Sequence, residues 1–282
     1  PVLKNNGLRL HAVLITENSG NFSPALYLEP YYQSYLNGIP VSTLARRMAA
    51  VYRNHRWSAE LSLEELFPGD TIRDRILFRL IHYNRNRELL EEVPHIPFLD
   101  LAVVFYFTVS HSCLGTGSCL LRYAHLNELS LTEAGLWPLA LKNTSRILPA
   151  RVRPMEELLP EMLRELTREN SQTGRPVPEE LPEHLFPETC PMYVLTNPGC
   201  YYGAACLLYP DVLSDFAARL DSDLYILPSS IHEVILLARK NAPEQSALSE
   251  MVRQVNEADV PLCDQLSDRV YCYQKDLDRI TL

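Results

Sequence analysis

The sequence lacks the short motifs that usually identify nucleotide-binding, hydrolytic and metal-binding proteins. The glycine pair in Gly115-Thr116-Gly117 is far too short to count as a phosphate-binding loop. No G-x-S-x-G sequence places a serine on a sharp strand-to-helix turn. No C-x-x-C pair and no Cys/His set with zinc-finger spacing occurs. We therefore predict no metal site and no cofactor.

Long apolar runs and an excess of basic residues are also lacking. The longest apolar stretch, from Leu101 to Val109, is far shorter than the ~20 residues of a membrane span. The net charge is −9, whereas non-specific binding to nucleic acid or anionic membrane needs a surplus of Lys and Arg. We therefore expect a cytoplasmic protein that binds neither nucleic acid nor a membrane. Because the chain opens at Pro1 rather than Met, we also expect a natural segment before it.

Apolar residues make up 46% of the chain, which is enough for a sizeable core. The predicted strands arrive as adjacent pairs with short turns, followed by helices. This order favours an α+β fold with mainly antiparallel sheets, built from strand-turn-strand-helix units and packed by helices. A proline-rich stretch at 171–191 is expected to be a loop or linker. It would separate N-terminal (1–170) and C-terminal (192–282) α+β regions, or lie within one continuous domain.

Hydrophobic periodicity and turn residues locate the individual elements. We predict strands at 2–15, 22–28, 118–124, 192–196, 203–209, 223–227, 232–238 and 271–273. We predict helices at 30–36, 41–54, 62–65, 130–143, 154–169, 210–220 and 243–257.

The clearest predicted helix spans 71–93, where apolar residues recur at spacings of three, four and seven. Its polar face would carry Arg75, Arg79, His82 and Asn86. The first three form a candidate anion-binding stripe, because guanidinium groups match phosphate and carboxylate geometry. The alternative is a solvated face that pairs with nearby acids.

A strand buried on both faces is predicted at 98–109, and Asp100 interrupts it. A buried carboxylate needs a partner, so we expect Asp100 to accept from an arginine or a backbone donor. The alternative is that Asp100 lies in a cleft and acts as an acid or a base.

The best candidate site is the turn from Pro228 to Glu233, which lies between two apolar strands. The candidate ligand-binding residues are Ser229, Ser230, His232, Glu233 and Asn197, the last because it ends a neighbouring predicted strand. A catalytic interpretation makes a serine the nucleophile, His232 the base and Glu233 the orienting group. In an extended backbone, however, Ser230 and His232 are about 6.6 Å apart along the strand and Glu233 faces the opposite side. The alternative is a turn whose polar groups serve only the backbone.

Several segments resemble one bacterial family. They are Leu3-Lys-Asn-Asn-Gly7, Asp74-Arg-Ile76, Pro94-His95, Phe98-Leu-Asp-Leu-Ala102, Met192-Tyr-Val-Leu-Thr-Asn197 and Leu227-Pro-Ser-Ser-Ile-His-Glu233. The family is an uncharacterised domain of unknown function, common in anaerobic gut Firmicutes. The resemblance covers most of the chain and implies no activity, substrate or catalytic residue.

Two functions remain open at this stage. The absence of a mechanistic motif favours a non-catalytic intracellular binding or interaction protein for a small molecule or another protein. The alternative is an enzyme of unrecognised class, such as a hydrolase, that uses the Ser-Ser-Ile-His-Glu turn.

Overall fold

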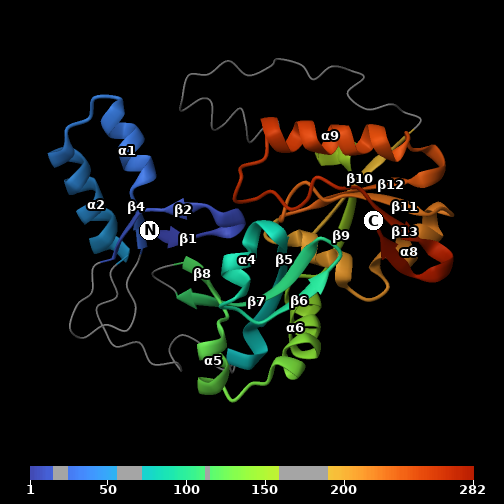
Figure 1. Cartoon of the computed structure of the whole chain (residues 1–282), viewed down its shortest axis with the longest axis horizontal. Coiled ribbons are helices and arrows are strands. Elements are labelled where there is room, and N and C mark those ends of the chain that lie inside the picture. The colour runs from blue at the N-terminus through green and yellow to red at the C-terminus, as the bar shows by residue number, and fades with distance from the viewer. Residues whose placement is uncertain (15–24, 56–71, 112–114, 159–189) are drawn as a thin grey trace. The chain divides into compact units, whose positions relative to one another are not determined.

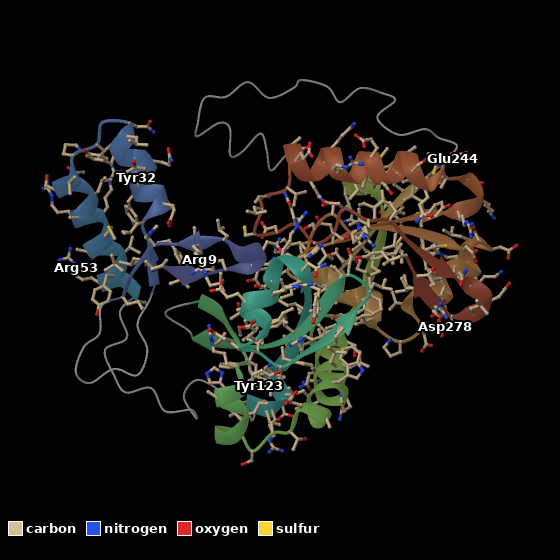
Figure 2. All side chains as sticks on the ribbon, in the orientation of Figure 1. Arg9, Tyr32, Arg53, Tyr123, Glu244 and Asp278 are labelled. Carbon is tan, nitrogen blue, oxygen red and sulfur yellow. The ribbon has the colours of Figure 1, made fainter. Side chains whose placement is uncertain are left out.

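The computed structural model describes residues 1–14, 25–55, 72–111, 115–158 and 190–282 (Figures 1 and 2). The chain divides into two compact units that are discontinuous in sequence. Unit 1 comprises Pro1–Phe78, Asn84–His95 and Val104–Asn143, and unit 2 comprises Arg79–Tyr83, Ile96–Val103 and Thr144–Leu282. The expected regions 1–170 and 192–282 stay a prediction, because most of the proline-rich stretch between them lies outside the described residues.

Unit 2 is built on a six-stranded sheet with the order β14-β13-β11-β12-β10-β9. Every adjacent pair in it is antiparallel. The strands are β9 (Arg151–Pro154), β10 (Met192–Thr196), β11 (Leu224–Leu227), β12 (Val234–Ala238), β13 (Tyr271–Gln274) and β14 (Arg279–Thr281). The predicted α+β class with antiparallel sheet is thus confirmed.

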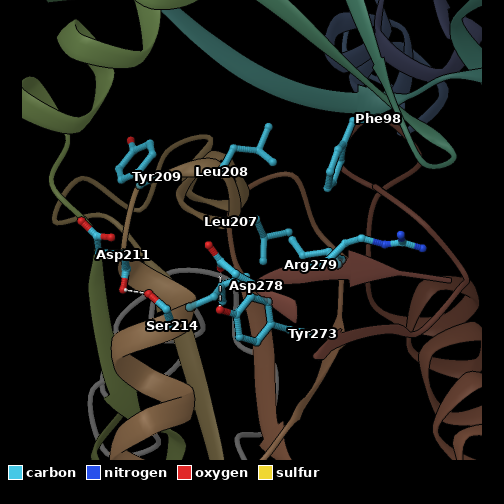
Figure 3. A pocket seen from close by; sticks show the side chains of 11 residues that line it. Phe98, Leu207, Leu208, Tyr209, Asp211, Ser214, Tyr273, Asp278 and Arg279 are labelled. Carbon is cyan, nitrogen blue, oxygen red and sulfur yellow. Dashed lines mark hydrogen bonds between the residues drawn. The ribbon is translucent and has the colours of Figure 1, made fainter. Parts of the chain in front are cut away.

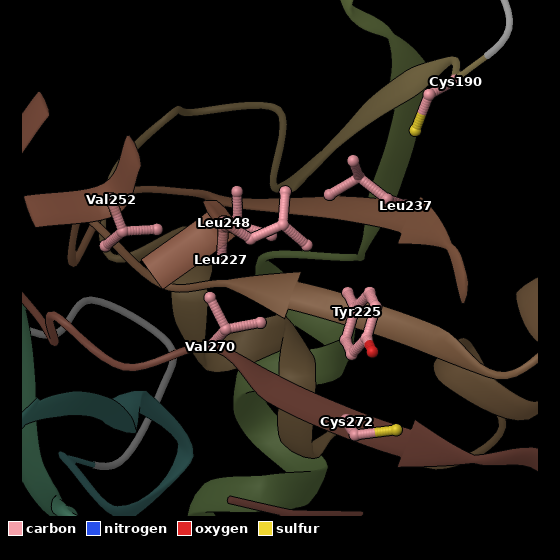
Figure 4. Packing of buried hydrophobic residues seen from close by; sticks show 8 residues of the cluster. All are labelled: Cys190, Tyr225, Leu227, Leu237, Leu248, Val252, Val270 and Cys272. Atoms are coloured by element: carbon pink, nitrogen blue, oxygen red, sulfur yellow. The ribbon is translucent and has the colours of Figure 1, made fainter. Parts of the chain in front are cut away.

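The helix α9 (Gln245–Ala258) covers one face of this sheet (Figure 4). Its residues Leu248 and Val252, one turn apart, are buried against Leu227 and Leu237 of the strands. The helix α8 (Val212–Leu220) also packs by one apolar face, and its Phe216 ring lies 5.0 Å from the ring of Tyr193. Both helices occur where the apolar spacing predicted them.

Unit 1 contains the hairpins β1 (Val2–Leu3) with β2 (Arg9–Leu10) and β3 (Ala12–Leu14) with β4 (Ala25–Tyr27). The helices α1 (Glu29–Leu36), α2 (Val41–His55), α4 (Arg87–Leu90), α5 (Tyr123–Glu128) and α6 (Glu133–Ile147) follow, α6 ending within unit 2. The predicted strand 2–15 is divided, because Asn6 (φ 58°) and Gly7 (φ 71°) turn the backbone in the left-handed region. Asn86 holds this turn by accepting the Asn6 N–H at 2.7 Å.

The prediction of a helix at 71–93 is wrong. This segment instead contains strand β5 (Ile76–His82). A four-stranded sheet joins β5, β7 (Leu101–His111) and β6 (His95–Phe98), with β8 (Gly115–Leu120) paired to β7. Ile76, Leu77, Phe78, Leu80 and Ile81 are all buried. A strand buried on both faces shows no alternation, so its apolar residues also satisfied helical spacing.

Two further expectations are corrected. Asp100 lies in the turn between β6 and β7, not inside a strand, because Leu99 (φ 54°) reverses the backbone just before it. Residues Gly203–Leu208 form a 3-10 helix, not the strand predicted at 203–209, and the chain enters it through Tyr202 at φ 55°. The short helix at 62–65, most of 171–191 and the end of the helix at 154–169 fall outside the described residues.

None of the helices in the described ranges is long and apolar enough to cross a membrane. None of the described cysteines takes part in a disulfide bond.

Candidate functional site

The turn 228–233 is bound to a second segment of unit 2 rather than projecting into solvent. The Ile231 N–H donates to the Asp264 carbonyl at 2.8 Å, and the Ser267 N–H donates to the Pro228 carbonyl at 2.8 Å. The carbonyl of Ser229 accepts the Leu266 N–H at 2.9 Å. These bonds fix the direction in which His232 leaves the turn.

Asn197 holds the loop that meets this turn. It is 1% exposed, and its Oδ1 accepts the Gly199 N–H at 3.0 Å while its Nδ2 donates to the Tyr201 carbonyl at 2.9 Å. Within the loop, Cys200 (φ 48°) and Tyr202 (φ 55°) occupy the left-handed region. Such conformations persist where the surroundings over-determine them. Asn197 therefore acts by placing Tyr201 and Tyr202.

The two tyrosines of this loop pack on the ring of His232. The Tyr202 and His232 rings are parallel within 7° at a centroid distance of 5.9 Å, and the Tyr201 centroid is 5.6 Å from His232. The backbone N–H of Tyr202 donates to His232 Nδ1 at 3.3 Å. Because Nδ1 accepts, the neutral ring carries its proton on Nε2, which faces Asp264 Oδ1 at 3.5 Å. Both ring nitrogens thus have partners.

The Ser230 hydroxyl binds a backbone group of the turn and makes no hydrogen bond with the His232 ring. It is 5% exposed, and its Oγ accepts the His232 backbone N–H at 3.0 Å. A nucleophilic serine would instead donate to a ring nitrogen of its base.

Glu233 is partly buried beside the turn. Burial raises the pKa of its carboxyl, although the neighbouring His232 and a hydrogen bond with Ser230 lower it. A carboxyl with a raised pKa in the folded state favours folding most while it is protonated, and this contribution is lost as pH rises through that pKa.

Glu233→Gln should therefore stabilise the protein at pH 7, by up to about 1 kcal/mol. At pH 4 the gain should disappear, because the wild-type carboxyl is then largely protonated as well. Urea unfolding at the two pH values measures both quantities. An equal gain in stability at pH 4 and pH 7 would contradict a raised pKa of the Glu233 carboxyl in the folded state.

The predicted stripe of Arg75, Arg79 and His82 does not exist as a helix face, because the segment is a strand preceded by a 3-10 turn that ends at Arg75. Arg79 stacks 4.4 Å above the Tyr202 ring and donates to the Tyr202 hydroxyl. His82 Nε2 lies 4.0 Å from Asp100 Oδ2. Arg79 and His82 thus have different partners, Tyr202 and Asp100 respectively.

Asp100 accepts from hydroxyl groups, not from the arginine or backbone donor that we expected. Ser267 Oγ donates to it at 2.7 Å and Tyr271 Oη at 2.6 Å. Burial, followed by the charge of Asp100, raises the pKa of the Tyr271 phenol. The phenol therefore stays protonated at neutral pH and remains a donor.

Sequence reasoning did not select Tyr201, Tyr202, Gly203 or Asp264. For Tyr201, Tyr202 and Gly203, the sequence signal that could have been used is an aromatic pair followed by a glycine, shortly after a buried strand. Asp264 carried no local signal, since its role comes from pairing with a turn more than thirty residues earlier. Within the described ranges, no three His, Cys, Asp or Glu side chains gather to hold a metal ion.

No curated protein and no solved structure matches the chain. A family model described as a family of unknown function, DUF5688, matches residues 1–275. The match spans the buried strands, Asn197, the tyrosine loop and the turn around His232. The chain therefore belongs to this family of unknown function.

Proposed function

We propose that the chain is a non-catalytic binding protein, and that its ligand contacts the ring surface formed by Tyr201 and His232. The single observation that carries this proposal is the occupation of both His232 ring nitrogens, by the Tyr202 N–H and by Asp264. A ring held in this way is a fixed contact surface. To act as a general base toward Ser230 it would need a free nitrogen near that hydroxyl.

The exposure of the rings supports the same assignment. Tyr201 is 44% exposed, while Tyr202 beneath it is 7% exposed. The Tyr201 hydroxyl donates to the Tyr202 hydroxyl at 2.9 Å, which holds the outer ring on the inner one. A rigid exposed aromatic ring contributes contact area at low entropic cost. The ligand that suits it carries a planar or aromatic group, on a small molecule or a protein.

The binding surface is tested with indole as the probe. In two-dimensional ¹H–¹³C spectra, indole should shift the ring signals of His232, with a dissociation constant in the millimolar range. Tyr201→Ala should abolish these shifts, because it removes the exposed ring. Tyr35→Ala is the matched control, since Tyr35 is a 50% exposed tyrosine outside this loop and outside unit 2. Loss of the shifts in both variants, or in neither, would overturn the proposal.

The absence of serine catalysis is tested separately with a fluorophosphonate probe. We expect no labelling of Ser230, and the same background ester hydrolysis in wild type and Ser230→Ala. Covalent labelling that maps to Ser230 would replace the binding proposal with a hydrolase.

A further inference from the structure

The helix α2 of unit 1 has a basic face. It carries three arginines and no acidic residue, although the whole chain has a net charge of −9. Arg46 and Arg53 are seven residues apart, so they lie on the same side of the helix, about 10.5 Å apart along its axis. Both are exposed, and neither forms an ion pair with a residue that the structure describes (Figure 2).

The small residues Ala45 and Ala49 lie beside these arginines on α2, and both are exposed. The opposite side of the helix packs into unit 1, where Leu44 is only 6% exposed. Small side chains allow the axis of a second helix to come close. The outer side of α2 is therefore an exposed apolar stripe with two cations along one edge.

The helix α9 of unit 2 has the complementary pattern. Besides the residues that it buries on the sheet, it has a second apolar stripe that is exposed. In this stripe Met251 and Val255 are one turn apart and are 40% and 37% exposed. Glu250 and Glu257 flank the stripe on one side, are exposed, and are also seven residues apart.

The acidic residues of α9 are available to a partner. Glu257 forms no ion pair within the described ranges. Glu250 pairs with Arg253 of the same helix at 2.8 Å, but an exposed pair of this kind contributes little and can exchange partners. Positions 244–259 carry four acidic residues and one arginine, so the surroundings of the stripe are acidic.

The stripe on α9 lies outside the cavity of about 300 Å³ that Figure 3 shows in unit 2. That cavity lies beside α8, β13 and β14, and none of the residues described along its wall belongs to α9. Small-molecule sites are concave, whereas an exposed helix face suits a second helix. Among the described α-helices, only α2 has no acidic residue.

We propose that α2 of one copy of the chain packs against α9 of a second copy. The two apolar stripes then face one another and lose contact with water. Arg46 and Arg53 lie opposite Glu250 and Glu257. Because both pairs have the same seven-residue spacing, the two ion pairs form together, as they do between the charged positions of a coiled coil.

Sedimentation velocity of the full chain tests this association. The average mass should rise with protein concentration and fall again in about 1 M NaCl, where the Debye length is only about 3 Å. A monomer at every concentration would overturn the proposal and leave these faces to other partners. Association that NaCl leaves unchanged would overturn the ion pairing.

Charge reversal identifies the two faces. Arg46→Glu combined with Arg53→Glu should weaken self-association at least about tenfold, because it places like charges opposite one another. Glu250→Arg combined with Glu257→Arg should do the same, although it makes the chain less negative. An equimolar mixture of the two variants should associate, since the unchanged α2 of one meets the unchanged α9 of the other. A mixture of folded variants that stays monomeric would overturn the proposal, and circular dichroism confirms that each variant is folded.

Arg47→Glu is the matched control for Arg46→Glu. Arg47 is also exposed on α2, but its side chain leaves the helix about 100° away from that of Arg46. The control should leave the association constant within about twofold, whereas Arg46→Glu should lower it several-fold. Equal losses in the two variants would mean that net charge, rather than this face of α2, governs association.

Discussion

Gly203→Ala should lower the free energy of unfolding by about 3 kcal/mol, which is a large effect for the addition of one methyl group. A Cβ at this position would lie 2.2 Å from Thr196 Oγ1 and 2.4 Å from the His232 carbonyl oxygen. These two atoms cannot move apart easily, since Thr196 Oγ1 donates to that carbonyl at 2.8 Å. The methyl group would therefore push the tyrosine loop off the turn that carries His232.

Urea unfolding measures this change, and Gly199→Ala provides a control within the same loop. A Cβ at Gly199 would meet only Asn197 Oδ1, at an ordinary 3.4 Å. We expect the control to change stability by less than about 1 kcal/mol. If the two alanine variants were equally stable, the close approach at Gly203 would be absent in solution.

Asp100→Ala should destabilise the protein by about 3 kcal/mol. The substitution leaves the hydroxyls of Ser267 and Tyr271 without the acceptor that now lies 2.7 Å and 2.6 Å away. Hydrogen bonds to a charged group contribute about 1.5–3 kcal/mol each, and buried donors without a partner add a desolvation cost. The Asp100 side chain is only 11% exposed, so water does not readily replace it.

A double-mutant cycle with Tyr271→Phe isolates the pair. We expect a coupling energy of about 1–2 kcal/mol between positions 100 and 271. Asp276→Ala, at an exposed aspartate, should stay within about 0.5 kcal/mol of wild type. Additive effects at 100 and 271, or a neutral Asp100→Ala, would mean that this hydrogen bond is not formed in solution.

The local pattern predicted most elements of unit 2 correctly. β10 and β11 combine β-branched and aromatic residues with flanking turns, and α8 and α9 each carry one apolar stripe. The same rules failed at β5. Its residues are apolar on both faces, and period alone does not separate a fully buried strand from a helix.

The candidate site was predicted in part. The turn 228–233 and Asn197 could be selected because both follow buried strands, and the tyrosine loop does connect them. What could not be predicted was the side-chain pairing. The segment 264–267 binds the turn, and Tyr271 binds Asp100, through contacts between residues far apart in sequence. No local pattern encodes such pairings.

The discontinuity of unit 2 has a consequence for biosynthesis. Residues 79–83 and 96–103 are translated early, yet their unit is completed only by strands near the end of the described chain. Ser267 follows Asp100 by 167 residues. At about 5–20 residues per second, that interval lasts roughly 10–30 s on the ribosome. Throughout it, residues 79–83 and 96–103 lack part of the unit to which they belong, so we expect their apolar side chains to favour aggregation of the nascent chain until the last strands have emerged.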